Sequence, residues 1–385
     1  MFSDRTNWNL AHNRLSETLA RTQAQGSSFL DLTTSNPTEC GLRYNSEAIL
    51  RSLQNPAVLT YRPDPKGLPG ARAAVAQYYR SHGIEVSAED IILTTSTSEA
   101  YSFVFRLLCN PGDELLVPAP SYPLFEYLAD IQDVKLSPYS LVYDHGWQID
   151  LHALERALTA RTRGLVVVHP NNPTGHFVKN AERGALNEIC TSRGIALIAD
   201  EVFLDFPLEP QSATSFAGET RALTFTLTGI SKICGLPQMK MAWLAVSGPE
   251  QVKTQALERL EIIADTYLSM NTPVQLALPA FLDQRTDFHR QLMERVRSNL
   301  SELDRQLSLQ NSMNRLRVEG GWYAVLRVPA TRSDEELAIS LLETKGVYVH
   351  PGHFYNFPGD GYVVLSLITP EQDFSEGVNR LISVV

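Results

Sequence analysis

The sequence predicts an α/β protein in which a mostly parallel sheet with helices on both faces is joined to a smaller α+β domain. Between about residues 90 and 248, short apolar runs alternate with helical stretches. Near-continuous apolar strands separated by helices are typical of a parallel sheet buried on both faces. After about residue 249 a long helical stretch is followed by strands around one further helix, which indicates a second unit.

The first expected element is a helix near the N-terminus. Apolar residues with helical spacing run through residues 6–25, and Gly26 follows them. Glycine commonly ends a helix because it tolerates the left-handed backbone conformation. We expect residues 1–45 to form an N-terminal arm and helix that belong to the small domain.

Six apolar runs are expected to form the sheet of a large domain at residues 46–270. They are DIILTTS (90–96), ELLVPAP (114–120), GLVVVHP (164–170), IALIADE (195–201), ALTFTLTG (222–229) and AWLAVSG (242–248). In open parallel sheets, ligands bind beyond the carboxyl ends of the strands. Polar residues follow four of these runs, namely Ser96-Thr97-Ser98, Asn171-Asn172, Asp200-Glu201 and Ser231-Lys232.

The remaining chain is expected to be helical over about 249–312 and to form a small C-terminal domain over 271–385. Its expected strands surround a helix at 333–345, and they are RLRV (315–318), WYAVLRV (322–328), VYVH (347–350) and YVVLSLI (362–368).

Composition and charge exclude several classes of protein. The 385 residues carry a net charge of −10, which disfavours nucleic-acid binding because such proteins need a basic surface. No apolar signal core or stretch of eighteen apolar residues is present, so we expect a cytoplasmic protein that does not bind a membrane. No metal-binding spacing occurs among the four cysteines, which we expect to be reduced: Cys40, Cys109, Cys190 and Cys234.

Lys232 is the first candidate for chemistry. An amine among apolar neighbours and near a second cation, Lys240, has its charged form destabilised and becomes a nucleophile for an aldehyde. Its clearest biological use is an imine with pyridoxal phosphate, whose pyridine nitrogen needs a carboxylate partner such as Asp200. The alternatives are a solvated loop lysine and an aspartate that caps a helix.

A set of short motifs, in this order and spacing, resembles the class I/II aminotransferase family of fold-type-I pyridoxal-phosphate enzymes. The resemblance covers nearly the whole chain and rests on SNPT (35–38), TTSTSEA (94–100), PAPSYPLF (118–125), NNPTG (171–175), ADEVF (199–203), SKICGLP (231–237), GGWY (320–323) and HPGHF (350–354).

The resemblance implies roles around the cofactor ring. Lys232 would hold the cofactor as an imine and carry a proton between the substrate Cα and the cofactor. Asp200 would keep the pyridine nitrogen protonated. Asn172 would bind the ring oxygen, and Tyr122 would stack on the ring face.

The resemblance also implies a phosphate site, a substrate contact and a homodimer with shared active sites. A helix N-terminus offers free N–H groups to a phosphate. Asn36 would contact the substrate, and Tyr61 would reach the phosphate bound by the neighbouring subunit. The other expected phosphate ligands are Ser96, Thr97, Ser98, Ser231 and Lys240.

Three residues depart from the family pattern. Lys240 stands where an arginine is usual, and Phe203 stands where a tyrosine usually donates to the ring oxygen. Val364 aligns with the arginine that usually grips the substrate α-carboxylate, and a carboxylate buried beside valine would lack a charge partner. Either the substrate lacks that carboxylate, or another cation binds it, with Arg43, Arg62, Lys66 and Arg327 as candidates.

We therefore expect an aminotransferase that moves an amino group between a small amino donor and an oxo acceptor; its substrate is unusual for the family if no other cation replaces the arginine at Val364. A pyridoxal-phosphate lyase or decarboxylase shares the same cofactor motifs and is the alternative. A non-catalytic scaffold is disfavoured because Lys232, Asp200 and Asn172 are all present. His353 is a further candidate for the substrate pocket.

Overall fold

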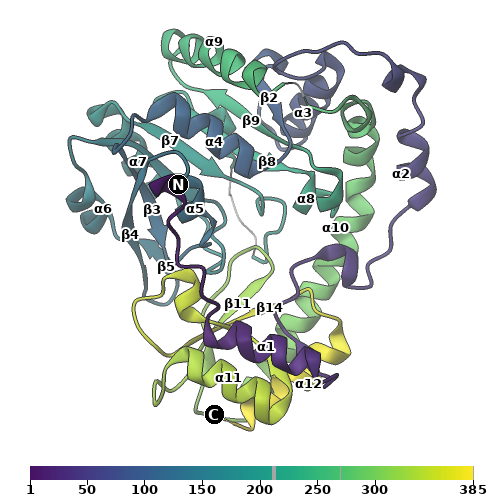
Figure 1. Ribbon diagram of the computed structural model, residues 1–385, viewed down its shortest axis with the longest axis vertical. Coiled ribbons are helices and arrows are strands. Elements are labelled where there is room, and N and C mark those ends of the chain that lie inside the picture. Colours follow the sequence, from purple (N-terminus) through teal and green to yellow (C-terminus); the bar gives the residue numbers. More distant parts are fainter. Residues whose placement is uncertain (210–213, 269, 385) are drawn as a thin grey trace.

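The computed structural model describes residues 1–209, 214–268 and 270–384 (Figure 1). At its centre lies an eight-stranded sheet in the order β2-β9-β8-β7-β6-β3-β4-β5. These strands are β2 (Ile91–Thr94), β3 (Glu114–Ala119), β4 (Lys135–Tyr143), β5 (Trp147–Ile149), β6 (Thr162–Val168), β7 (Ala196–Asp200), β8 (Thr224–Gly229) and β9 (Ala242–Ser247).

The mostly parallel sheet expected from the sequence is confirmed. Five central strands pair in parallel, in the order β8-β7-β6-β3-β4. At one edge β9 pairs antiparallel with both β8 and β2, and at the other edge β5 pairs antiparallel with β4. All six predicted runs form strands. The outer pair β4 and β5 was not predicted, because β4 is partly exposed, with a mixed polar and apolar sequence that includes Pro138.

Both faces of the sheet are buried under helices. In β6, Val166 packs into the apolar cluster that also contains residues of α4, α5 and α9, whereas Val167 packs into the opposite cluster, which contains residues of α6 and α7. The helices that follow the chain through this region are α2 (Ser46–Ser52), α3 (Pro69–Ser81), α4 (Thr97–Leu108), α5 (Leu124–Asp130), α6 (Leu151–Ala157), α7 (Asn180–Arg193), α8 (Ile230–Ile233), α9 (Glu250–Thr266) and α10 (Thr272–Leu307).

Below the large sheet in Figure 1 lies a smaller α+β region, as predicted. Its four-stranded antiparallel sheet has the order β10-β11-β14-β13, and β1 pairs with β12 in parallel. The elements are α1 (Arg14–Ala24), β1 (Leu30–Asp31), β10 (Asn314–Arg315), β11 (Tyr323–Arg327), α11 (Asp334–Lys345), β12 (Val347–Tyr348), β13 (His350–Pro351), β14 (Tyr362–Ser366) and α12 (Glu371–Ile382). Helix α12 was not predicted from the sequence.

The N-terminal helix exists but begins later than predicted. Asn13 caps α1 by accepting a hydrogen bond from the Ser16 amide (2.7 Å), so the helix starts at Arg14. The segment before it lies against the large domain, where the Trp8 indole donates to Asp130 (2.8 Å). From α1 onward the arm contacts the small region, since α1 contacts α11 and β1 pairs with β12, and at its end the Tyr44 hydroxyl donates to the Gly235 carbonyl of the large region.

Helix α10 connects the two regions. Its contacts include α2 and α3 on one side and α12 and β10 on the other, and Figure 1 shows it running from the large sheet to the small one. The boundary at residues 270 and 271 stays a prediction.

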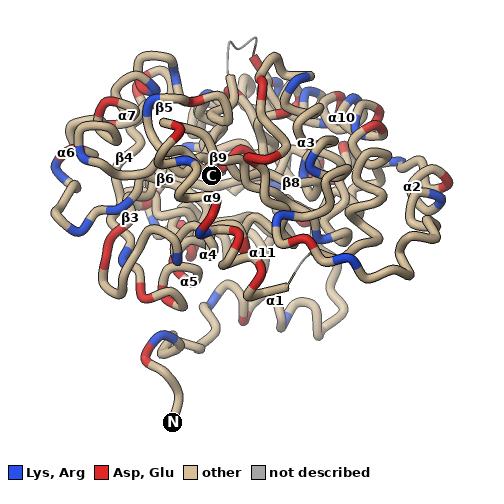
Figure 2. The backbone as a smooth tube through the Cα atoms, turned by 90° about the horizontal axis from the view of Figure 1, so that it is seen from above, with Lys and Arg blue, Asp and Glu red and all other residues tan. Residues whose placement is uncertain are grey.

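Charges of both signs are interspersed over the molecule (Figure 2). None of the helices in the described part of the chain has the length and apolar character needed to cross a membrane.

Candidate active site

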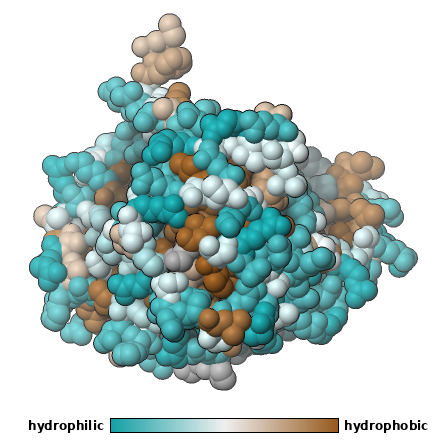
Figure 3. Space-filling view, turned by 90° about the horizontal axis from the view of Figure 1, so that it is seen from below, coloured by the Kyte–Doolittle hydropathy of each residue, from teal (hydrophilic) through white to brown (hydrophobic). Residues whose placement is uncertain are grey.

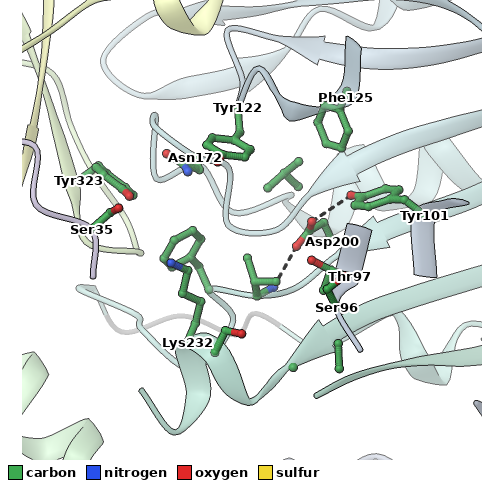
Figure 4. Close-up of a pocket in the computed structure, with 16 residues that line it drawn as sticks. Ser35, Ser96, Thr97, Tyr101, Tyr122, Phe125, Asn172, Asp200, Lys232 and Tyr323 are labelled. Carbon is green, nitrogen blue, oxygen red and sulfur yellow. Dashed lines mark hydrogen bonds between the residues drawn. The ribbon is translucent and has the colours of Figure 1, made fainter. Parts of the chain in front are cut away.

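A cavity of about 240 Å³ opens at the carboxyl ends of the parallel strands, where the sequence analysis expected a ligand (Figure 4). Val168, Asp200 and Gly229 line it, and they are the last residues of β6, β7 and β8. The structure therefore brings together side chains that follow different strands. Seven of the predicted site residues line this cavity: Ser96, Thr97, Tyr122, Asn172, Asp200, Ser231 and Lys232.

Lys232 lies in the short helix α8, which follows β8 directly. Its amine lies over two aromatic rings, 4.9 Å from the ring centroid of Trp322 and 5.8 Å from that of Phe203. Burial lowers the pKa of Lys232 to about 8, although the charge of Asp200 acts in the opposite direction. At pH 7 the amine is then neutral in about a tenth of the molecules, far more than for an ordinary lysine, and is available as a nucleophile.

Asp200 is buried beneath the cavity and holds a fixed orientation. One carboxylate oxygen accepts a hydrogen bond from the Tyr101 hydroxyl (2.9 Å), and the other accepts one from the Val202 amide (3.1 Å). Burial raises the pKa of Asp200 to about 6 despite these hydrogen bonds. A cationic ligand group beside the carboxylate would relieve this desolvation cost, because opposite charges favour the ionised form. The residues after Asp200 form turns, so it does not cap a helix.

Asn172 and Tyr122 lie across the cavity from Lys232 (Figure 4). The amide oxygen of Asn172 is buried and has no hydrogen-bond partner among the described residues. Buried polar atoms are normally paired, so this oxygen is suited to accept a hydrogen bond from a ligand. The loop of Tyr122 is anchored by its neighbour Ser121, whose amide donates to the Tyr355 carbonyl (2.9 Å) and whose hydroxyl accepts from Asn171 (3.3 Å).

The N-terminus of α4 lies at the cavity floor. Ser96 caps this helix by accepting a hydrogen bond from the Glu99 amide (3.1 Å), and Thr97 begins the first turn. First-turn N–H groups have no partner within their own helix, which suits an anion. Of the other expected phosphate ligands, Ser231 lines the cavity, whereas Ser98 and the exposed Lys240 are outside its lining.

Several predicted residues lie elsewhere. The Asn36 side-chain oxygen caps the short 3-10 helix at 37–39 by accepting from the amide and hydroxyl of Thr38, and its neighbour Ser35 lines the cavity instead. Tyr61 is 76% exposed and His353 is also exposed, and neither lines the cavity. Val364 is buried in β14, outside the lining.

Sequence reasoning missed four residues of the site. Tyr101 lies one helical turn after Thr97 on α4, and this i, i+4 spacing was an available signal. Trp322 and Tyr323 belong to the GGWY motif, which supported the resemblance without suggesting a role for either ring. Ser35 begins the SNPT motif, which suggested a role only for Asn36, and its position in the cavity depends on how the N-terminal arm folds back.

Comparison with known proteins gives a consistent result. The sequence model of the family described as aminotransferase class I and II matches residues 29–380. The glutamate–pyruvate aminotransferase of Escherichia coli K12 is 31% identical over 266 residues, a match that spans 68% of this chain and only 65% of that relative. The Haemophilus influenzae glutamate–pyruvate aminotransferase is 25% identical over 374 residues, covering 94% of this chain and 91% of that relative.

A solved structure has the same fold. The alanine aminotransferase from Pyrococcus furiosus superposes with a TM-score of 0.91 at 22% identity, covering 100% of this chain and 99% of the other. At this level of identity the similarity is one of fold.

Proposed function

The chain belongs to the class I and II aminotransferase family, and from this we propose that it moves an amino group from a small amino donor to an oxo acceptor. Members of this family use pyridoxal 5'-phosphate. One observation carries the proposal: the low-pKa amine of Lys232 and the buried carboxylate of Asp200 line the same cavity.

The cavity fits this cofactor at each of its functional groups. Asp200 would pair with the ring nitrogen, Asn172 would donate a hydrogen bond from its side-chain NH2 to the ring oxygen, and Tyr122 would cover one ring face. Ser96, Thr97 and Ser231 would receive the phosphate. When bound, the cofactor supplies an aldehyde that captures the donor amine and a ring that withdraws electrons from the reacting carbon.

Lys232 has two tasks in the proposed reaction. Its Nζ would hold the cofactor through the aldehyde carbon, with release of water, and once displaced by the donor amine it would serve as the base that moves the proton of the donor Cα. A base with a pKa of about 8 suits this exchange, because proton transfer is most efficient when the pKa lies near the working pH. The rings of Trp322 and Phe203 keep bulk water away from this amine.

Transamination can be tested through its two half-reactions. A suitable donor is expected to remove the visible absorbance of the bound cofactor, and a 2-oxo acid should restore it without fresh cofactor. Recovery of that absorbance together with stoichiometric amine transfer would support the proposal. Release of carbon dioxide, or loss of a side-chain substituent from the donor, would contradict it in favour of a decarboxylase or lyase.

We also propose a homodimer with shared active sites. Tyr61 is 76% exposed and does not line the cavity of its own chain, as expected for a residue that serves a neighbour. Two further large apolar side chains are exposed: Leu59, close to Tyr61 in the sequence, and Leu268, just after α9. The N-terminal segment, with exposed Met1 and Phe2, projects from the body in Figures 2 and 3. Such surfaces favour covering by a second copy.

Subunit complementation tests this sharing. A mixture of Lys232→Ala chains and Tyr61→Ala chains, each inactive alone, is expected to regain about a quarter of wild-type activity after random subunit exchange, because half of the dimers then hold one intact site. The control mixture of Lys232→Ala with Asp200→Ala should stay inactive, because both residues serve the same subunit's cavity. Failure of the first mixture after verified exchange would contradict sharing.

The cytoplasmic location and the domain boundaries expected from the sequence stay predictions.

A further inference from the structure

Two hydroxyl groups form the wall of the cavity on the side of Lys232 away from Asp200. Ser35 comes from the N-terminal arm and Tyr323 from β11, and Figure 4 shows them facing each other across a short gap. If Asp200 holds the ring nitrogen of the cofactor, this wall faces the substituents of the reacting carbon. The two hydroxyls are therefore in position to contact the part of the donor next to its amine.

The structure holds this pair firmly. Tyr323 is buried and pairs with Ser366 of β14. The Ser366 amide donates to the Leu32 carbonyl (2.7 Å), and its hydroxyl donates to the carbonyl of Thr34, the residue before Ser35. Strand β14 thus binds the arm to the sheet that carries Tyr323. A site whose groups are fixed by such contacts is preorganised for a ligand.

The wall formed by Ser35 and Tyr323 carries no charged side chain. Within the described ranges, Lys232 is the only cationic residue in the cavity lining, and the residues outside those ranges include no lysine or arginine. Val364 lies in β14 opposite Val325, on the sheet face that carries Tyr323, and is 1% exposed. In a single chain, the other candidate cations are absent from the lining, namely Arg43, Arg62, Lys66 and Arg327. In the proposed dimer Arg62 adjoins Tyr61, so fast reaction of alanine would indicate that a cation of the second copy reaches this wall.

We propose that Ser35 and Tyr323 are specificity-determining residues that bind a neutral hydrogen-bonding group on the carbon next to the donor amine. The preferred donor is then an amino alcohol or an amino acid amide rather than a free α-amino acid. A carboxylate at this wall would lose its hydration without gaining a charge-assisted partner, whereas a hydroxyl or amide can exchange hydrogen bonds with both side chains. This inference rests on the proposed aminotransferase function.

The test compares donors that differ only at that group. Single-turnover half-reactions of the enzyme with bound cofactor are measured with 2-amino-1-propanol, alaninamide, alanine, and 2-aminobutane, which replaces the hydroxyl of the amino alcohol by a methyl group. We expect the amino alcohol and the amide to react at least about tenfold faster, at subsaturating concentration, than alanine or 2-aminobutane, the effect of about one hydrogen bond.

Variants then assign the preference to the two hydroxyls. In Tyr323→Phe and in Ser35→Ala, the ratio of the 2-amino-1-propanol rate to the 2-aminobutane rate should fall toward one, mainly through weaker donor binding. The matched control is Tyr362→Phe, which removes a tyrosine hydroxyl from the small sheet outside the cavity lining and should keep the wild-type ratio. The cofactor absorbance of each variant verifies that the site has folded.

The outcomes separate this inference from the function on which it rests. Alanine that reacts as fast as the amino alcohol would overturn the inference, as would an unchanged rate ratio in both cavity variants. If no donor of any class removes the cofactor absorbance, the aminotransferase proposal itself fails.

Discussion

Replacing Lys232 by alanine is expected to abolish turnover and covalent attachment of the cofactor while leaving the fold intact. The amine is the only cationic group among the described lining residues, so no second lysine can take over its bond to the aldehyde or its proton transfers. Loss of such a group typically lowers kcat on the order of 10⁴-fold or more. The fold should survive because the substitution removes a partly desolvated charge and keeps the backbone of α8.

Borohydride reduction followed by peptide mass spectrometry provides the direct measurement. The wild-type protein should carry the reduced cofactor on Lys232, and the alanine variant should carry none. Lys135→Ala is the matched control, since this lysine is exposed in β4 outside the cavity lining and its loss should leave the adduct unchanged. An adduct on Lys240 would contradict the assignment.

Replacing Asp200 by asparagine is expected to lower kcat at least about a hundredfold, comparable to the loss of one key electrostatic group in other enzymes. Asparagine keeps the size of the side chain: its single oxygen can accept the hydrogen bond of the Val202 amide, and its NH2 group can donate to the Tyr101 hydroxyl, which in the wild type donates to the carboxylate. What it removes is the negative charge that would keep the ring nitrogen of the cofactor protonated. The variant Asp200→Glu, which retains the charge, should lose less activity.

The loss should not come from unfolding. Because the folded-state pKa of Asp200 is raised to about 6, above its usual 3.8, this group destabilises the cofactor-free fold as pH rises from about 4 to about 6 and remains ionised and unfavourable at pH 7. Removing the charge should therefore leave the melting temperature of the cofactor-free protein equal or higher at pH 7. Unchanged kinetics with cofactor bound would refute the role.

The sequence predicted the large sheet better than its outer strands. Runs such as GLVVVHP and IALIADE are almost wholly apolar because both of their faces are covered, and that pattern identifies a strand without further context. Strand β4 has exposed positions and a mixed sequence, so its pairing with β3 was not visible in the sequence. Helix α1 was predicted too long because apolar spacing continued into Trp8 and Leu10, which lie before the Asn13 cap.

By itself the sequence determined which polar groups share one edge of the sheet. Lys232, Asp200 and Asn172 each follow an apolar strand, and the carboxyl ends of parallel strands meet at the same edge, so chain order alone predicted their convergence. Only the tertiary structure determined which other side chains line the cavity with these polar groups. Ser35 and Tyr323 are nearly 300 residues apart and meet because β14 holds the N-terminal arm against the small sheet. No local pattern encodes such a contact, because it depends on packing between segments that are distant in the chain.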